Sequence, residues 1–179
     1  MNVIQLIGGP GAGKSSIAAY LYYRFKKAGY RTELVGEAAR EIIYNANPGS
    51  TARQLMDNQV LVTGMQYERL QRLKRHGVRI AINDSPILQG LLYVNAVERM
   101  LMQPLFEAMA KQFDTTNIFI RRTPGVWDKE SRAQSEAEAM MQDKHASSLL
   151  PSHYTMAWGE EEALANHLLK DPQWCGEVR

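Results

Sequence analysis

Runs of hydrophobic residues alternate along this chain with stretches in which hydrophobic residues recur every three or four positions. The short runs predict β-strands, and the recurring pattern predicts amphipathic helices. The predicted strands cover residues 3–7, 32–35, 78–83, 117–120 and 154–158, and the predicted helices cover residues 14–28, 37–45, 51–76, 87–112, 135–150 and 160–169. Parallel strands need crossover connections, which are usually helices. The pattern therefore predicts an α/β fold in which helices flank both faces of a five-stranded parallel sheet.

Residues at the ends of these segments favour the same boundaries. Gly29 follows the first predicted helix, where glycine is a common C-cap. An Asn-Pro-Gly sequence at residues 47–49 breaks the chain after the second helix. Thr51, with Gln54 three residues later, has the spacing of a capping box. We therefore expect the third helix to begin at Thr51 and to run to His76.

A glycine-rich segment connects the first predicted strand to the first predicted helix. It reads Gly8-Gly9-Pro10-Gly11-Ala12-Gly13-Lys14-Ser15 and matches the pattern G-x-x-x-x-G-K-[ST] at every fixed position. The glycines allow successive backbone N–H groups to surround a phosphate, and the helix N-terminus adds its positive dipole end. In such a loop Lys14 reaches the β- and γ-phosphates and Ser15 binds Mg²⁺. The segment predicts a phosphate-binding loop (P-loop) that holds ATP with Mg²⁺.

A P-loop alone is compatible with several classes of protein. The chain contains no N-K-x-D sequence for reading guanine, which argues against a GTPase. With 179 residues it also has no room for the additional domain of an oligomeric motor ATPase. A small kinase is the favoured interpretation, and a regulatory ATPase or an ATP-gated binding module is the alternative.

Two acidic residues follow predicted strands whose carboxyl ends should face the P-loop. Asp84 follows residues 78–83 and is a candidate ligand for Mg²⁺, with a helix-capping role as the alternative. Glu37 follows the second strand and is a candidate to accept the proton of an attacking hydroxyl. Arg40 lies one helical turn later, where it is placed to bind an acceptor phosphate. The alternative reading makes Glu37 a first-turn acid that is favoured by the helix dipole and Arg40 its solvated partner.

Arginines follow the fourth predicted strand. Arg121 and Arg122 come directly after it, and Arg132 lies in the polar stretch beyond. Phosphoryl transfer needs cations near the γ-phosphate, and a lid that carries arginines is a recurrent way to supply them. We expect a lid at about residues 121–134, in which Trp127 either stacks on a base or anchors the lid.

Composition and charge are those of an ordinary folded protein. The chain is 45% hydrophobic and 22% charged with a net charge of +2, and we expect one domain over residues 1–170 and a loose tail over residues 171–179. Cys175 is the only cysteine, and neither a signal peptide nor a run of about 20 apolar residues is present. A cytoplasmic protein without membrane contact is therefore expected. Five basic residues and no acid lie between Arg69 and Arg79, which indicates a solvated helix face or, as the alternative, a surface for phosphate-rich partners.

Several segments together resemble a known group of enzymes. These are N-V-I-Q-L-I-G-G-P-G-A-G-K-S-S, E-L-V-G-E-A-A-R-E, I-N-D-S-P-I-L, and F-I-R-R with a later S-R-A-Q. Over about residues 2–169 the chain resembles small P-loop kinases of tailed bacteriophages, and most of all the 5-hydroxymethyluracil DNA kinases, which are relatives of thymidylate kinase. The segment E-x-A-R-E is also similar to bacterial ribosylnicotinamide kinases.

The resemblance implies an ATP site formed by residues 8–16, which adds Ser16 to the loop, with Glu37 and Asp84 at the catalytic centre and Arg132 as a lid arginine. It implies phosphorylation of the base hydroxymethyl group in phage DNA, within the host cytoplasm, as a step in thymidine hypermodification. Thymidylate and nucleoside kinases often carry Arg directly after the acid at the position of Asp84, whereas this chain has Ser85. A nucleoside, a nucleotide or ribosylnicotinamide is the alternative acceptor.

Overall fold

The computed structural model describes residues 1–44, 57–122, 136–149, 154–157 and 159–171. Within them five strands form one parallel sheet in the order β2-β3-β1-β4-β5. The strands are β1 (Asn2–Ile7), β2 (Thr32–Val35), β3 (Ile80–Asn83), β4 (Asp114–Arg121) and β5 (Tyr154–Ala157). All five predicted strands are confirmed, and the order places β1 at the centre with β3 and β4 beside it.

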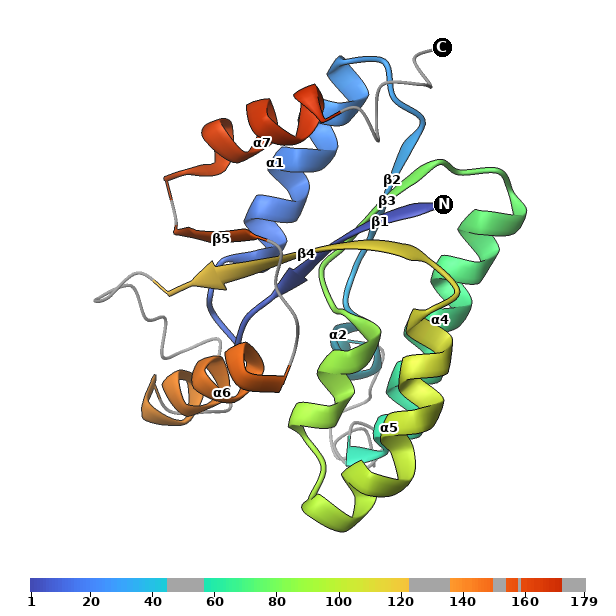
Figure 1. Cartoon of the computed structure of the whole chain (residues 1–179), viewed down its shortest axis with the longest axis vertical. Helices are drawn as coiled ribbons and strands as arrows, with labels where there is room; N and C mark the ends of the chain where they lie inside the picture. The colour runs from blue at the N-terminus through green and yellow to red at the C-terminus, as the bar shows by residue number, and fades with distance from the viewer. Residues whose placement is uncertain (45–56, 123–135, 150–153, 158, 172–179) are drawn as a thin grey trace.

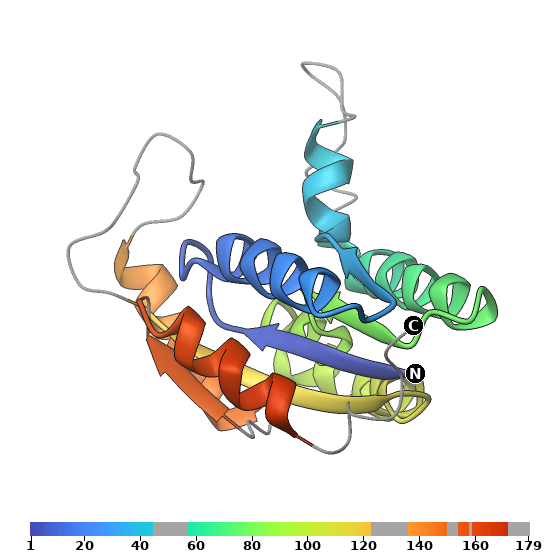
Figure 2. The same cartoon turned by 90° about the horizontal axis from the view of Figure 1, so that it is seen from above.

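Helices cover both faces of the sheet, as predicted (Figures 1 and 2). One face carries α1 (Lys14–Lys27) and α7 (Glu161–Lys170). The other carries α4 (Gln59–Arg75), the 3₁₀ helix η1 (Ile87–Leu92), α5 (Ala96–Ala110) and α6 (Glu136–Leu149). The short helix α2 (Ala38–Tyr44) continues from the carboxyl end of β2 and projects from the body in Figure 2.

The alternation of side chains along the central strand divides the core into two layers. Ile4 and Leu6 of β1 pack with α1 and α7, whereas Val3 packs on the opposite face with Leu70 of α4 and Phe106 of α5. All five side chains are fully buried. Burial on both faces explains why the strands read as continuous hydrophobic runs instead of alternating ones.

Two of the predicted helices have different boundaries in the structure. We expected the third helix to begin at Thr51, which lies outside the described residues. In the structure α4 begins at Gln59. Asn58 is its N-cap, and the Asn58 side chain accepts a hydrogen bond from the backbone N–H of Leu61. The helical structure predicted over about residues 87–112 is confirmed, but it is divided in two. The chain forms η1, breaks, and starts α5 at a capping box between Asn95 and Glu98. Both differences come from overlooked Asn caps, which compete with helix continuation.

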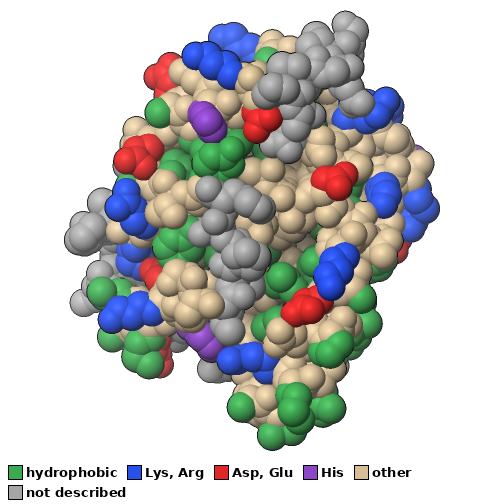
Figure 3. Space-filling view, in the orientation of Figure 1, with side chains coloured by type: hydrophobic (Ala, Val, Ile, Leu, Met, Phe, Trp, Pro, Cys, Tyr) green, Lys and Arg blue, Asp and Glu red, His purple; other side chains and the backbone are tan. Residues whose placement is uncertain are grey.

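Helix α5 buries little of its apolar surface. Phe106 is its one fully buried side chain, while Val97, Met100, Leu101 and Leu105 are exposed. Figure 3 shows hydrophobic side chains gathered at the end of the molecule where α5 begins. Among the described residues, no helix combines the length and the hydrophobicity that crossing a bilayer requires.

Candidate phosphate-transfer site

The P-loop connects the carboxyl end of β1 to the first turn of α1. Gly11 and Gly13 have φ angles of 76° and 89°, a left-handed conformation that L side chains adopt at a cost. Gly13 is the N-cap of α1, so the helix begins at Lys14 with its N-terminal amides directed into the loop. The predicted loop therefore has the backbone that phosphate binding requires.

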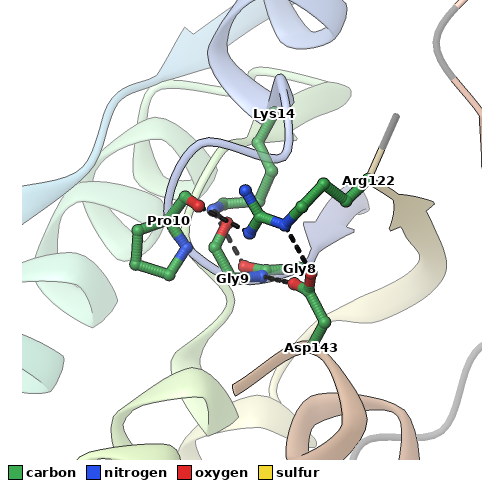
Figure 4. A network of polar contacts seen from close by, with 6 residues as sticks. All are labelled: Gly8, Gly9, Pro10, Lys14, Arg122 and Asp143. Carbon is green, nitrogen blue, oxygen red and sulfur yellow. Dashed lines mark hydrogen bonds and ion pairs between the residues drawn. The ribbon is translucent and has the colours of Figure 1, made fainter. Parts of the chain in front are cut away.

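Gly9 serves a different purpose from the other loop glycines. Its backbone N–H donates to Asp143 Oδ1 of α6 at 2.5 Å (Figure 4). A Cβ atom added at Gly9 would lie 2.6 Å from this oxygen and 2.9 Å from the carbonyl oxygen of Ala139. The absence of a side chain at Gly9 thus allows α6 to pack against the loop.

Arg122 completes this contact from the end of β4. Its Nε donates to Asp143 Oδ2 at 2.9 Å, and a terminal nitrogen donates to the carbonyl oxygen of Pro10 at 2.7 Å (Figure 4). The Arg122–Asp143 ion pair is largely buried. Arg122, which we expected to be a lid arginine that binds substrate, thus lies beside the loop, and the structure adds Asp143, which no motif in the sequence singles out.

Lys14 lies over the same loop. Its Nζ donates to the carbonyl oxygens of Gly8 and Gly9 at 2.9 and 3.0 Å (Figure 4). The ammonium group is therefore held at the mouth of the loop, where phosphate oxygens attract a cation most strongly.

Ser15 and Asp84 meet although they are far apart in the sequence. The Ser15 hydroxyl donates to Asp84 Oδ2 at 2.6 Å. Burial raises the pKa of Asp84, and the charge of Glu37 raises it further, whereas the charges of Lys14 and Arg40 and the hydrogen bond from Ser15 lower it. The predicted pair of Mg²⁺ ligands is thus assembled in one place.

The fit of this pair to Mg²⁺ can be tested on its atoms. Asp84 Oδ1 is buried and has no hydrogen-bond partner among the residues that the structure describes. A buried, unpaired carboxylate oxygen beside a serine hydroxyl supplies the hard oxygen ligands that Mg²⁺ prefers. In the described part of the chain, no group of three or more His, Cys, Asp or Glu residues is arranged to hold a metal ion. The donors fit a Mg²⁺ ion that is held by one carboxylate, one hydroxyl and the phosphates of a nucleotide.

A cavity of about 220 Å³ opens next to these residues. The side chains of Glu37 and Arg40 line it together with Ser15 and Asp84, so the structure brings the predicted acid and arginine to the phosphate side of the sheet. The remaining lining residues are Ala18, Leu34, Gly36, Glu41 and Tyr44. The cavity therefore joins the P-loop to a space with acidic, basic and aromatic walls.

Tyr93, at the end of η1, was not identified from the sequence. The residue is 39% exposed, but its hydroxyl end is enclosed. Burial of the hydroxyl raises the pKa of Tyr93, a hydrogen bond with Gln89 lowers it, and the charges of Glu37 and Asp143 raise it. Tyr93 thus lies within electrostatic range of Glu37 and Asp143.

Several predicted residues lie elsewhere. Arg132 and Trp127, with most of the predicted lid, lie outside the described residues, and Arg121 is exposed at the end of β4. In the basic stretch, Arg69 pairs with Glu41 and Arg75 with Glu68, and Lys74 donates to the carbonyl oxygen of Gln112. Much of this stretch thus makes contacts within the protein, which favours its interpretation as a helix face over that as a surface for phosphate-rich partners.

Comparison with known proteins gives one family and several similar folds. The family model described as AAA domain matches residues 3–155. A probable adenylyl-sulfate kinase of Archaeoglobus fulgidus is 36% identical over 77 residues, which are 42% of this chain and 46% of that protein. The chain thus matches less than half of this curated relative.

One of two similar solved structures supports the fold. The thymidylate kinase of Ehrlichia chaffeensis superposes with a TM-score of 0.62 at 13% identity, covering 94% of this chain and 98% of the other. The APS kinase CysC of Mycobacterium tuberculosis gives a TM-score of 0.47 at 12% identity and covers 94% of both chains. The architecture is therefore that of thymidylate kinase, a P-loop kinase fold.

Proposed function

The chain belongs to the family described as AAA domain, and from this premise we propose that it is a kinase that transfers the γ-phosphoryl group of ATP to an acceptor hydroxyl. The observation that carries the proposal is the cavity in which Glu37 and Arg40 share walls with Ser15 and Asp84. A kinase needs an acceptor site that opens directly onto its phosphate site. An ATP-gated binding module needs no such junction.

The ATP half of the proposed site is residues 8–16, including Ser16 at the first turn of α1. The loop amides and Lys14 hold the phosphates, and Ser15 and Asp84 hold the Mg²⁺ ion. When bound, Mg²⁺ offsets negative charge on the phosphates. Arg122 lies beside Pro10 and supplies a further cation there, and we assign the same role to the predicted lid residue Arg132.

Glu37 is the proposed acceptor-side catalytic residue. The acceptor oxygen forms a bond to the γ-phosphorus while the bond from the γ-phosphorus to the bridging oxygen breaks, so that ADP leaves. The proton of the acceptor hydroxyl passes to the Glu37 carboxylate. This role is supported by the position of Glu37, which lines the cavity beside Ser15 and Asp84.

The cavity favours a nucleoside-like acceptor. Its volume of about 220 Å³ is smaller than the roughly 300–1,000 Å³ of sites that enclose a drug-sized ligand, so it fits part of a nucleoside. Carboxylates of Glu37 and Glu41 accept hydrogen bonds from hydroxyl groups, and the Tyr44 ring offers an apolar face. We propose that Arg40 orients the acceptor, binding its phosphate if it carries one.

A hydroxymethyluracil base in DNA is the second candidate. The resemblance to the phage DNA kinases supports it. On the face shown in Figure 3, however, Lys and Arg side chains are scattered among acidic ones. The contacts of Arg69, Lys74 and Arg75 also draw the basic stretch into the protein. For these reasons we rank DNA below a small molecule as the candidate acceptor.

One assay tests the reaction and separates the acceptors. The protein is incubated with Mg²⁺ and ATP labelled in the γ-phosphate, together with deoxynucleosides, deoxynucleotides, ribosylnicotinamide, hydroxymethyluracil DNA or unmodified DNA. We expect label in a small acceptor and a loss of about 10²–10⁴-fold in kcat in Glu37→Gln, with unchanged ATP binding. ATP hydrolysis that no acceptor accelerates would refute the kinase assignment.

Salt dependence checks the choice of acceptor. Transfer to DNA should weaken steeply with rising ionic strength, because DNA binding releases condensed counterions. Transfer to a small acceptor should change little. Label in hydroxymethyluracil DNA alone, with a steep salt dependence, would replace the first candidate with the second.

A further inference from the structure

Gln66 is buried in the middle of α4 and is 2% exposed. Its side-chain amide contacts the chain just after β2 and at the end of β3. Buried amides are satisfied by hydrogen bonds, and one that links two strand ends fixes their relative position. Two residues of the proposed site adjoin these contacts. Glu37 lies between Gly36 and Ala38, and Asp84 directly follows Asn83.

The first contact holds the backbone on both sides of Glu37. The backbone N–H of Ala38 donates to Gln66 Oε1 at 3.0 Å, and Gln66 Nε2 donates to the carbonyl oxygen of Gly36 at 3.2 Å. The amide thus pairs with the backbone as a neighbouring strand would. Arg69, one helical turn later, donates to the same carbonyl oxygen at 2.9 Å.

The second contact reaches the residue before Asp84. Gln66 Nε2 donates to Asn83 Oδ1 at 2.6 Å, and this oxygen also accepts the backbone N–H of Ser85 at 3.4 Å. A backbone N–H can only donate and a carbonyl oxygen can only accept, so Ala38 and Gly36 determine which end of the Gln66 amide is which. Asn83 must then direct its side-chain oxygen towards Gln66. The same oxygen bonds to Ser85, so the residues on both sides of Asp84 take part in this contact.

We propose that Gln66 is a positioning residue that fixes Glu37 and Asp84 relative to each other, so that acceptor and magnesium sites are aligned. The inference rests on the proposed kinase function. It adds to that function a residue that acts through Glu37 and Asp84, because Gln66 is 2% exposed and its amide is bonded to Gly36, Ala38 and Asn83. The sequence gives no sign of it, since Gln66 lies in a helix far from either motif.

The test compares Gln66→Met with Gln71→Met on the same helix. Gln71 donates to the Tyr67 hydroxyl at 2.7 Å, so both changes remove a side-chain amide that is hydrogen-bonded in α4, but only the first affects the strand ends. For Gln66→Met we expect kcat to fall about 10–100-fold while the KM for ATP stays within about twofold, because the P-loop is untouched. For Gln71→Met both constants should stay within about twofold of the wild type.

Thermal unfolding separates positioning from stability alone. A lower Tm in Gln66→Met with wild-type kcat would overturn the proposal. If Gln66→Met does not fold, Asn83→Ala decides, since it leaves Gly36 and Ala38 bound to Gln66 and removes the link from Gln66 to β3, together with the longer contact from the backbone N–H of Ser85. A wild-type kcat in Asn83→Ala would then overturn it, and a reduced kcat at unchanged ATP KM would support it.

If the wild type phosphorylates no acceptor, the effect of Mg²⁺ on ATP affinity still tests whether Gln66 is a positioning residue. That result refutes the proposed function, but calorimetry still measures how much Mg²⁺ strengthens ATP binding. We expect this enhancement to shrink several-fold in Gln66→Met, or in Asn83→Ala, and to persist in Gln71→Met. An equal enhancement in all of them would refute the positioning role by itself.

Discussion

The two halves of the site are built in different ways. The phosphate-binding part of the ATP half is one continuous segment, residues 8–16, whose glycines and helix N-terminus create the binding geometry locally. The acceptor half is assembled from the ends of β2 and β3 and from α2. Contacts between residues that are distant in the sequence hold these segments in place. A local motif thus identifies a phosphate site, whereas an acceptor site depends on tertiary contacts.

The two halves also differ in charge. At the proposed phosphate site, Lys14 lies beside the Arg122–Asp143 ion pair, so the net charge of these three side chains is positive. The cavity is lined by Glu37, Glu41 and Asp84 with one arginine. This polarity suits transfer from an anionic donor to a hydroxyl-bearing acceptor, because each side attracts its own ligand. Changes confined to one half should therefore have separable effects.

The largest effect is expected in the ATP half. Lys14→Ala removes the ammonium group above the loop and should lower phosphoryl transfer by about 10²–10³-fold or more. ATP binding, measured by calorimetry, should weaken as well, in contrast to Glu37→Gln. Lys26→Ala is the matched control, because Lys26 lies in the same helix but pairs with Glu33 at 3.0 Å. Normal transfer by Lys14→Ala would refute the assignment of the loop.

The contrast between the two halves explains what sequence reasoning achieved. The strands were predictable because each is a buried hydrophobic run, and the P-loop because its spacing follows from local backbone geometry. Glu37 and Asp84 were identified by a topological rule, that ligands bind beyond the carboxyl ends of parallel strands. All of these inferences needed only neighbours in the sequence or the order of the elements.

The remaining features depend on distant contacts. Asp143 reaches Gly9 only because α6 packs on the sheet face that carries η1. Gln66 resembles any other polar residue of α4 until β2 and β3 are placed beside it. No local propensity distinguishes such residues, because their partners lie 17 to 134 positions away along the chain.

A smaller effect is expected where the P-loop depends on a distant contact. Gly9→Ala places a Cβ atom against Asp143 and the backbone of Ala139, which cannot move away as easily as a flexible side chain. We expect the free energy of unfolding in urea to fall by about 1–3 kcal/mol. Gly64→Ala is the control, because a Cβ atom at Gly64 in α4 meets nothing within 4 Å. That variant should gain up to about 1 kcal/mol, and equal stability of the two variants would contradict the close packing of α6.

The smallest expected effect tests the point at which the two halves meet. Because burial raises the pKa of Asp84, the protonated carboxyl is favoured in the folded protein, and its ionisation opposes folding. The contribution of Asp84 to stability is thus fully present below the ordinary pKa of aspartate and is lost as pH rises through the raised pKa of the folded state. Asp84→Asn cannot ionise, so without nucleotide or Mg²⁺ it should be more stable than the wild type at neutral pH.

Urea titrations over a range of pH measure this difference. The advantage of Asp84→Asn should be largest at neutral pH and should shrink towards acid pH. The same variant should lose the Mg²⁺ enhancement of ATP binding, because the amide replaces an anionic ligand. Stability and function would then oppose each other at one carboxylate, as expected for a charge kept buried to bind a cation. An advantage that grows towards acid pH would show that the ionised form is the one the folded protein favours.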